Sequence, residues 1–184
     1  MKKLIVVIGL PGCGKDTVGE FLKEKGIPAF DVAGVVRREM RKVNLPITKE
    51  NQERFAKDMR MKHGMDIFGR LLGKELEREP SEIICITGPR TLDELIHWEK
   101  LGKIVTLEIV ADEKIRFERC HKRGNKWDPK TIADLRMRDR SNLEQLGLAK
   151  LLKTEKYPRY VINNNGSKAA LKEKVLVFLR KIKE

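Results

Sequence analysis

A glycine-rich stretch that directly follows an apolar run constrains this chain more than any other feature of its sequence. Residues 9–17 have the order Gly-Leu-Pro-Gly-Cys-Gly-Lys-Asp-Thr, the apolar run before them covers residues 4–8, and residues 18–22 have a helical pattern. This order of strand, glycine loop and helix is the context that a phosphate-binding loop requires. The stretch therefore predicts a site for the phosphate groups of a nucleotide.

The residue types in this stretch suit an anion. The backbone freedom of Gly9, Gly12 and Gly14 lets the loop curl so that successive N–H groups point inward. A helix that begins near Lys15 directs its positive end to the same place, and the lysine adds a mobile charge. The alternative is an ordinary glycine-rich turn. Cys13 is either a thiol made acidic by its position or a small filler.

Length and composition bound the class of protein. With 184 residues, of which 40% are hydrophobic and 36% are charged, the chain suits one soluble domain, residues 1–184, with a proper core. No apolar run approaches the length of a membrane span, and the three cysteines show no disulfide spacing. We therefore expect a cytoplasmic protein with reduced thiols and no membrane partner.

The rest of the chain alternates between short apolar runs and longer helical patterns. The predicted strands cover residues 3–9, 28–31, 83–87, 103–110 and 160–163. The predicted helices cover residues 15–25, 35–40, 49–62, 66–78, 91–100 and 112–123, with another begun by Asp128 and Pro129 and a last one capped by Ser167. Nearly all strands lack polar alternation, so we expect an α/β fold with a five-stranded parallel sheet and helices on both faces. Ligands bind such sheets at the carboxyl ends of the strands, where the glycine loop lies.

Arginines follow several of the predicted strands. Arg37 and Arg38 come after the second strand, Arg90 after the third, and six more lie in residues 116–140. The planar guanidinium group suits bidentate contact with phosphate oxygens. Arg37 and Arg90 are the stronger candidates because each directly follows a strand or opens a helix there. For Arg38, Arg123 and Arg136, a solvated helix surface is an equally good interpretation.

The net charge of +13 indicates an anionic partner, either a nucleic acid or a small polyanionic substrate. Only two Trp and two Tyr are present, and no basic run is interleaved with aromatic residues as a base-stacking surface requires. We therefore expect nucleotide phosphates as the main partner and keep RNA as the second interpretation.

Several of these motifs together resemble a known family. Residues 9–17 look like the phosphate loop of adenylate kinase and its relatives, and residues 87–90 (Thr-Gly-Pro-Arg) are similar to their Asp-Gly-x-(Pro)-Arg segment. Residues 116–140 look like their arginine-bearing lid. The likeness extends over nearly the whole chain to archaeal adenylate-kinase-related proteins described as nucleotide or dephospho-coenzyme-A kinase-like. Shared stretches include Arg-Phe-Glu-Arg at 116–119 and Asn-x-Gly-Ser at 164–167.

The resemblance implies a role for each residue that matches. The donor, ATP or GTP, would be bound by Gly9, Pro11, Gly12, Cys13, Gly14, Lys15, Asp16 and Thr17. The acceptor phosphate would be bound by Arg37, Gly88 and Arg90. The groups acting on the transferring phosphoryl group would be Lys15, Arg90, Arg119, Arg138 and Arg140. Mg²⁺ would accompany the donor and lie near Asp16, Thr17 and Thr87.

The chain departs from the family pattern at three positions. Asp16 stands where many phosphate loops have Ser or Thr, and Thr87 stands where the family usually has a metal-supporting Asp. One hypothesis is that the carboxylate and the hydroxyl have exchanged places around the metal; the alternative is that Asp16 only favours the helix N-terminus. Gly34 stands where the acceptor segment often has Asp.

These observations predict a nucleotide kinase, a phosphotransferase that moves the γ-phosphoryl group of ATP or GTP to a small phosphate-bearing acceptor such as AMP. The resemblance implies a helical acceptor-binding insert at about 34–79 and a short lid at about 120–140, which includes Trp127. One alternative is a dephospho-coenzyme-A kinase-like activity. The others are an RNA-associated NTPase in ribosome assembly and a nucleotide-binding regulator with weak turnover, which the missing Asp at position 87 would favour.

Overall fold

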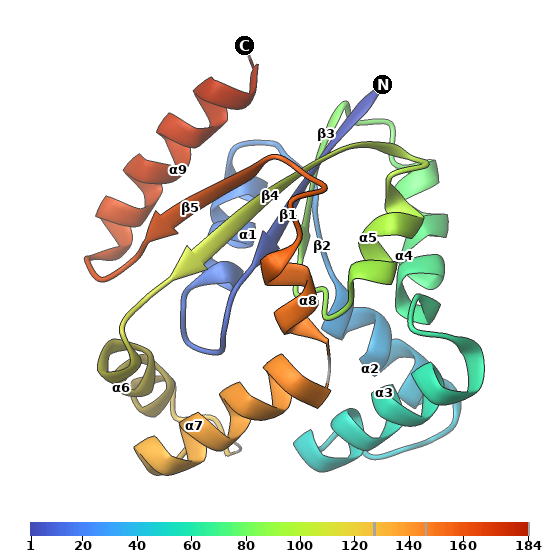
Figure 1. The fold of residues 1–184 in the computed structure, drawn as a ribbon, viewed down its shortest axis with the longest axis vertical. Helices are drawn as coiled ribbons and strands as arrows, with labels where there is room; N and C mark the ends of the chain where they lie inside the picture. The colour runs from blue at the N-terminus through green and yellow to red at the C-terminus, as the bar shows by residue number, and fades with distance from the viewer. Residues whose placement is uncertain (127, 146, 184) are drawn as a thin grey trace.

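A five-stranded parallel sheet forms the centre of the computed structural model, which describes residues 1–126, 128–145 and 147–183 (Figure 1). Its strands are β1 (Lys2–Ile8), β2 (Ala29–Asp31), β3 (Ile83–Thr87), β4 (Gly102–Val110) and β5 (Arg159–Asn163). Their order is β2-β3-β1-β4-β5, and every neighbouring pair is parallel. The predicted sheet is therefore confirmed, with β1 and its glycine loop at the centre.

The described helices are α1 (Lys15–Glu24), α2 (Val32–Lys42), α3 (Lys49–His63), α4 (Ile67–Arg78), α5 (Leu92–Trp98), α6 (Glu113–Arg123), α7 (Ile132–Arg140), α8 (Leu148–Lys153) and α9 (Lys168–Lys183). They cover both faces of the sheet, because successive strand residues such as Val6 and Val7 point to opposite sides. Val7 packs in a core with α1 and α9. Val6 packs in the other core with α2, α4, α5 and α8, where Trp98 is fully buried.

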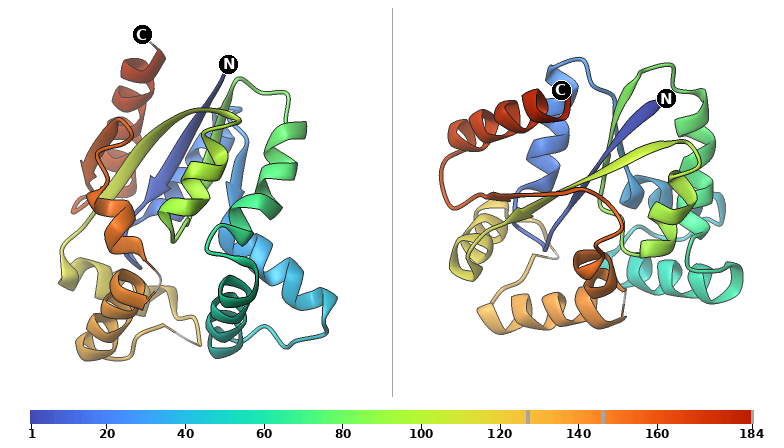
Figure 2. Two further views of the ribbon diagram at one scale, coloured as in Figure 1. Left: turned by 45° about the vertical axis from the view of Figure 1, so that its right-hand side comes forward. Right: turned by 45° about the horizontal axis from the view of Figure 1, so that its top comes forward.

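The helices α2, α3, α6 and α7 extend past the carboxyl ends of the strands (Figure 1). The pair α2 and α3 lies on one side and the pair α6 and α7 on the other, and Figure 2 shows the same division from two further directions. The helices α3 and α4 and most of α2 fall within the expected insert, and α7 falls within the expected lid. Trp127, which the sequence places in that lid, lies outside the described residues.

One predicted helix start is wrong. The helix α7 begins at Ile132 rather than at Asp128, because Thr131 and Asp134 form a reciprocal capping box. The carboxylate of Asp128 is already used: it accepts hydrogen bonds from Arg123 and from the Asn125 backbone N–H. The sequence interpretation also missed α8 and a π-helical turn, Ser141–Gln145. No helix in the described ranges is both long and apolar enough to cross a lipid bilayer.

Candidate active site

Several glycines of the loop between β1 and α1 are required for steric reasons, as Gly12 and Gly14 show. Gly12 has a φ of 78°, and a Cβ atom there would lie 2.6 Å from the Arg116 backbone oxygen. Gly14 has a φ of 102°, and a Cβ atom there would lie 2.4 Å from Nδ2 of Asn164. Both positions combine a left-handed backbone with close neighbours. Larger residues would force the loop open.

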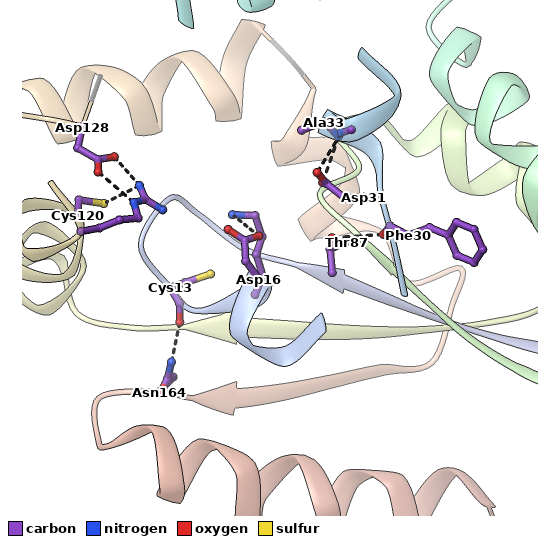
Figure 3. Close-up of polar contacts among 12 residues, drawn as sticks. Cys13, Asp16, Phe30, Asp31, Ala33, Thr87, Cys120, Asp128 and Asn164 are labelled. Atoms are coloured by element: carbon purple, nitrogen blue, oxygen red, sulfur yellow. Dashed lines mark hydrogen bonds and ion pairs between the residues drawn. The ribbon is translucent and has the colours of Figure 1, made fainter. Parts of the chain in front are cut away.

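Two contacts from distant elements hold this loop in its curled form. Nδ2 of Asn164, directly after β5, donates a hydrogen bond of 2.8 Å to the Cys13 carbonyl oxygen (Figure 3). Arg116, at the start of α6, donates to the Pro11 carbonyl oxygen at 3.2 Å and pairs bidentately with Asp139. The sequence analysis gave Asn164 no role and placed Arg116 only among the lid arginines. Both residues stabilise the loop by donating hydrogen bonds to its carbonyl oxygens.

The start of α1 has backbone N–H groups that suit an anion. Gly14 caps the helix without a side-chain hydrogen bond, and the backbone N–H groups of Asp16 and Thr17 have no acceptor among the described residues. Free N–H groups at a helix N-terminus attract phosphate oxygens. Lys15 lies in the same turn, 13% exposed, with its Nζ 3.9 Å from the Asp16 carboxylate. Its charge is therefore available at the mouth of the loop.

A cavity of about 460 Å³ lies beside this loop, at the carboxyl edge of the sheet. This volume is in the range of small-molecule sites. Pro11, Gly12, Lys15 and Asp16 of the loop line one side, and residues of the expected insert and lid line the others. The arginines that line it are Arg37, Arg60, Arg90, Arg123 and Arg138. The structure thus brings insert, loop and lid to one strongly positive space.

The carboxylate of Asp31, at the end of β2, and the guanidinium group of Arg37, in α2, both line the cavity. Asp31 caps α2: its carboxylate accepts hydrogen bonds from the N–H groups of Ala33 and Gly34 (Figure 3). The same carboxylate pairs with Arg37 at 3.0 Å, and both side chains remain more than a third exposed. The sequence analysis noticed the missing Asp at position 34 but not Asp31. A carboxylate is therefore present beside Arg37, but it comes from Asp31 at the end of β2 rather than from position 34.

The end of β3 contributes Thr87, Gly88 and Arg90, which all line the cavity. The Thr87 hydroxyl donates a weak hydrogen bond of 3.4 Å to the Phe30 carbonyl oxygen (Figure 3). The Arg90 backbone N–H donates to Glu94, but no hydrogen bond or ion pair engages its guanidinium group among the described residues. Burial lowers the pKa of Arg90, while Glu94 opposes that shift. Arg90 stays charged, since its pKa starts far above neutrality.

The residues expected near a metal fit Mg²⁺. Asp16 and Thr87 offer oxygen atoms from α1 and β3 to the same cavity (Figure 3). No cluster of three or more His, Cys, Asp or Glu side chains able to hold a metal occurs in the described part of the chain. Mg²⁺ bound with a nucleotide needs no such cluster, because phosphates and waters supply most of its ligands. Thr17 does not line the cavity.

The lid arginines separate into different environments. Arg138 lines the cavity, and its guanidinium group forms no hydrogen bond or ion pair within the described residues, whereas Arg123 lines it while paired with Asp128. Arg119 does not line the cavity; it donates to the Gly166 carbonyl oxygen, and its buried Nη1 has no partner among the described residues. Arg140 is exposed and also lies outside the lining. Of the three lid residues expected to act on the phosphoryl group, only Arg138 faces the cavity here.

Cys13 is a buried filler rather than an acidic thiol. It is fully buried, and burial raises its pKa even though Lys15 acts in the opposite direction. Cys85 and Cys120 are also buried and free, and burial raises the pKa of Cys85 to about 12. The loop therefore contains a protonated small side chain at this position.

The chain matches a family model described as "AAA domain" over residues 5–143, more than half of its length. A "UPF0200 protein" of Hyperthermus butylicus is 34% identical over 140 residues, which cover 76% of this chain and 75% of the relative. The "UPF0200 protein" of Thermococcus gammatolerans is 30% identical over 184 residues, which cover 97% of this chain and 95% of the relative.

Solved structures share the fold at lower identity. TT1252 from Thermus thermophilus aligns with a TM-score of 0.65 at 22% identity, covering 98% of this chain and 97% of that one. A shikimate kinase from Acinetobacter baumannii in complex with shikimate aligns with a TM-score of 0.60 at 16% identity, covering 100% and 95%. A gluconokinase from Sinorhizobium meliloti aligns with a TM-score of 0.59 at 16% identity, covering 98% and 93%. The chain therefore belongs to the AAA-domain family and to the archaeal UPF0200 proteins, with the fold of P-loop kinases.

Proposed function

We propose that this protein is a nucleotide kinase that transfers the γ-phosphoryl group of ATP or GTP to a small phosphate-bearing acceptor, with AMP as the first candidate. One observation carries the proposal: a single cavity is bounded by the phosphate-binding loop on one side and by unpaired or half-exposed arginines of the insert and lid on the others. Hydrolysis of a nucleotide alone would not need a second positive wall opposite the loop.

The donor side follows from the loop. The free N–H groups at the start of α1 and the Lys15 ammonium group would hold the donor's β- and γ-phosphates. Bound Mg²⁺ would neutralise charge on those phosphates, and Asp16 and Thr87 are the side chains placed to hold it or its waters. Both groups stand at the loop side of the cavity, so the γ-phosphate would face the insert.

The acceptor side follows from the strand ends. An acceptor oxygen would attack the γ-phosphorus atom, and the bond from that atom to the β–γ bridging oxygen would break, which releases the nucleoside diphosphate. Phosphoryl transfer of this kind depends on positioning and on charge stabilisation more than on covalent help from the protein. Arg90 and Arg37 would bind the acceptor, and Arg138 would stabilise the moving group from the lid. Arg119 and Arg140 would contact the moving phosphoryl group only if the lid moves toward the cavity.

The second candidate is a kinase for a hydroxyl acceptor, such as dephospho-coenzyme A. Asp31 favours it, because this carboxylate lines the cavity at the end of β2 and is partly exposed. A carboxylate in that position would orient a hydroxyl group and accept its proton. Against it, both Asp31 oxygens already accept hydrogen bonds from the start of α2.

A phosphate-transfer screen tests the proposal. The protein is mixed with ATP or GTP, Mg²⁺ and a panel of nucleoside monophosphates and dephospho-coenzyme A, and the phosphorylated acceptor is detected separately from free phosphate. Lys15→Ala should lower transfer by about 100-fold or more, as expected for loss of one charge-stabilising donor. Lys25→Ala, which removes an exposed lysine just past α1, is the matched control.

Each outcome of the screen has one meaning. Strong phosphorylation of AMP or another monophosphate supports the first proposal, and phosphorylation of dephospho-coenzyme A alone supports the second. Free phosphate without phosphorylated acceptor contradicts both and favours an NTPase. Tight nucleotide binding without any turnover favours a regulator.

A further inference from the structure

A group of three charged side chains lies beside the cavity, where α3 meets the start of α5; Arg60 and Glu94 are buried and Arg90 is partly exposed. Arg60 of α3 is 5% exposed and pairs with the fully buried Glu94 of α5, at 3.1 Å from Nη2 to Oε1. Arg90 stands just before α5, and its own backbone N–H donates to the other Glu94 oxygen at 2.8 Å. Both Arg60 and Arg90 line the cavity.

The charges in this group do not balance. Glu94 provides the one carboxylate in contact, and its oxygens also accept backbone hydrogen bonds from Arg90 and Thr91 as part of a capping box. The Arg60 guanidinium group thus pairs with a carboxylate that backbone N–H groups also use, and no carboxylate pairs with the Arg90 guanidinium group among the described residues. Elsewhere in the cavity, Arg37 pairs with Asp31 and Arg123 pairs with Asp128, although both carboxylates also accept backbone hydrogen bonds. The excess positive charge lies at Arg60 and Arg90.

One buried atom of the group lacks a partner. Nε of Arg60 is out of contact with solvent and forms no hydrogen bond within the described part of the chain. The guanidinium group packs on the Phe68 ring, 5.0 Å from its centroid, which holds it in place. A buried N–H group without a partner costs about 1–3 kcal/mol, so this arrangement is expected to be kept for a ligand rather than for stability.

We propose that Arg60 and Arg90 together form the binding site for an oxyanion of the acceptor, a phosphate monoester or a carboxylate, and that Arg60 is a specificity-determining residue. The inference deepens the proposed function and rests on it only for the presence of an acceptor. An oxyanion in the cavity beside the two guanidinium groups supplies the missing negative charge. Arg37, with its charge already compensated by Asp31, then lies at the side of the acceptor rather than on its anion.

The test measures acceptor binding with the nucleotide site filled. Calorimetric titrations are run in saturating Mg²⁺ and ADP, with AMP and dephospho-coenzyme A as phosphate probes, gluconate and shikimate as carboxylate probes, and adenosine as the uncharged partner of AMP. Arg60→Gln should weaken binding of the best oxyanion probe by at least about tenfold, and Arg60→Lys by less. Arg54→Gln, which removes an exposed arginine from the same helix, should leave binding unchanged.

A second variant guards against a folding defect. Arg60→Gln leaves Glu94 buried without its ion pair, whereas the double change Arg60→Gln/Glu94→Gln removes both charges and keeps an amide oxygen for the capping box. The double variant should fold, bind Mg²⁺ and ADP normally, and lose the oxyanion. The single change Glu94→Gln should tighten oxyanion binding, because it removes the competing carboxylate.

The outcomes separate this inference from the proposed function. Unchanged oxyanion affinity in both Arg60 variants, or binding of none of the oxyanion probes by the natural protein, overturns it. Equal affinity for AMP and adenosine, with no carboxylate bound, also overturns it. If Arg60→Gln still transfers the phosphoryl group with an unchanged KM for the acceptor, the proposed kinase activity stands and the acceptor binds away from Arg60, which overturns this inference. If oxyanion binding depends on Arg60 but no phosphoryl transfer occurs, the oxyanion site is supported and the proposed kinase activity is contradicted.

Discussion

Asp16 stands where many phosphate loops have Ser or Thr, and we expect it to support the metal. Its side chain is 66% exposed on the first turn of α1 and lines the cavity. Thr87 lies at the end of the neighbouring strand β3, buried to 5% exposure, with its methyl group against Gly19. A carboxylate binds Mg²⁺ or its waters more strongly than a hydroxyl group does.

Asp16→Ala should therefore impair Mg²⁺-dependent turnover far more than Thr87→Ala. We expect the Mg²⁺ concentration for half-maximal rate to rise by about tenfold or more in Asp16→Ala, the range seen when a residue that supports a metal is removed. Thr87→Ala should change it little. Equal and small shifts in the two variants would contradict the idea that carboxylate and hydroxyl have exchanged places. Nucleotide binding measured without metal serves as the control.

The burial and ion pairing of Arg60 could not be predicted from the sequence. In the sequence it is one of many charged residues of a polar helix, with no motif around it. Its burial arises because α5 places Glu94 opposite it and α4 places Phe68 beneath it. Glu94 was predicted to lie in the helix over residues 91–100. The ion pair that it also forms needed the packing of three helices.

At the scale of elements, the segment between α6 and α7 is held by one ion pair. Arg123 at the end of α6 donates to Asp128 from Nε at 3.0 Å, and the Asn125 N–H donates to the same carboxylate. Burial acts to raise the pKa of Asp128, but the hydrogen bonds from Arg123 and Asn125 outweigh it and lower the pKa. This side of the cavity therefore depends on an ionised Asp128.

Asp128→Asn should destabilise the protein in a pH-dependent way. Because the folded-state pKa of Asp128 is depressed, its contribution is present above the unfolded pKa of about 3.9 and is lost as the pH falls further. We expect a loss of about 1 kcal/mol at pH 7, since the partner Arg123 is half exposed. Denaturant unfolding at pH 7 and pH 3 measures the difference, which should shrink at pH 3.

The control for this prediction is Glu118→Gln, which removes an exposed charge from the same helix α6. It should have little effect at either pH. A destabilisation by Asp128→Asn that stays constant between pH 7 and pH 3 would show that packing, rather than the ion pair, holds this segment.

Helix boundaries were predictable where a capping motif stands alone. Thr48 and Thr91 cap α3 and α5, next to the starts of the helices predicted over residues 49–62 and 91–100, and both accept backbone hydrogen bonds. The start of α7 was mistaken because two candidate caps lie close together, Asp128 and Thr131. Asp128 forms an ion pair with a residue of the preceding helix, which leaves Thr131 as the cap. Local propensity cannot decide between two such sites.

At the scale of the whole molecule, the net charge of +13 still allows an RNA partner. Exposed lysines and arginines attract any polyanion by counterion release, so we expect weak RNA binding that falls steeply between 50 and 200 mM salt. A filter-binding titration of single-stranded RNA across that range tests this. Arg90→Gln should not alter RNA binding, because Arg90 lines the cavity. Tight binding at 200 mM salt with RNA-stimulated release of free phosphate would instead favour the RNA-associated NTPase.

The sequence by itself determined the parallel sheet, the glycine loop and the edge of the sheet at which we expect a ligand. These depend on local patterns: unbroken apolar strands, glycines at set spacings and a helix that starts beside them. It also identified Arg37 and Arg90, which both line the cavity, Arg90 just after β3 and Arg37 from within α2. Only the tertiary structure decided which distant charges meet. Arg60 with Glu94, Asn164 with Cys13 and Arg116 with Asp139 are pairs separated along the chain. No local pattern predicts such pairs, since their geometry arises from helix packing over a finished sheet.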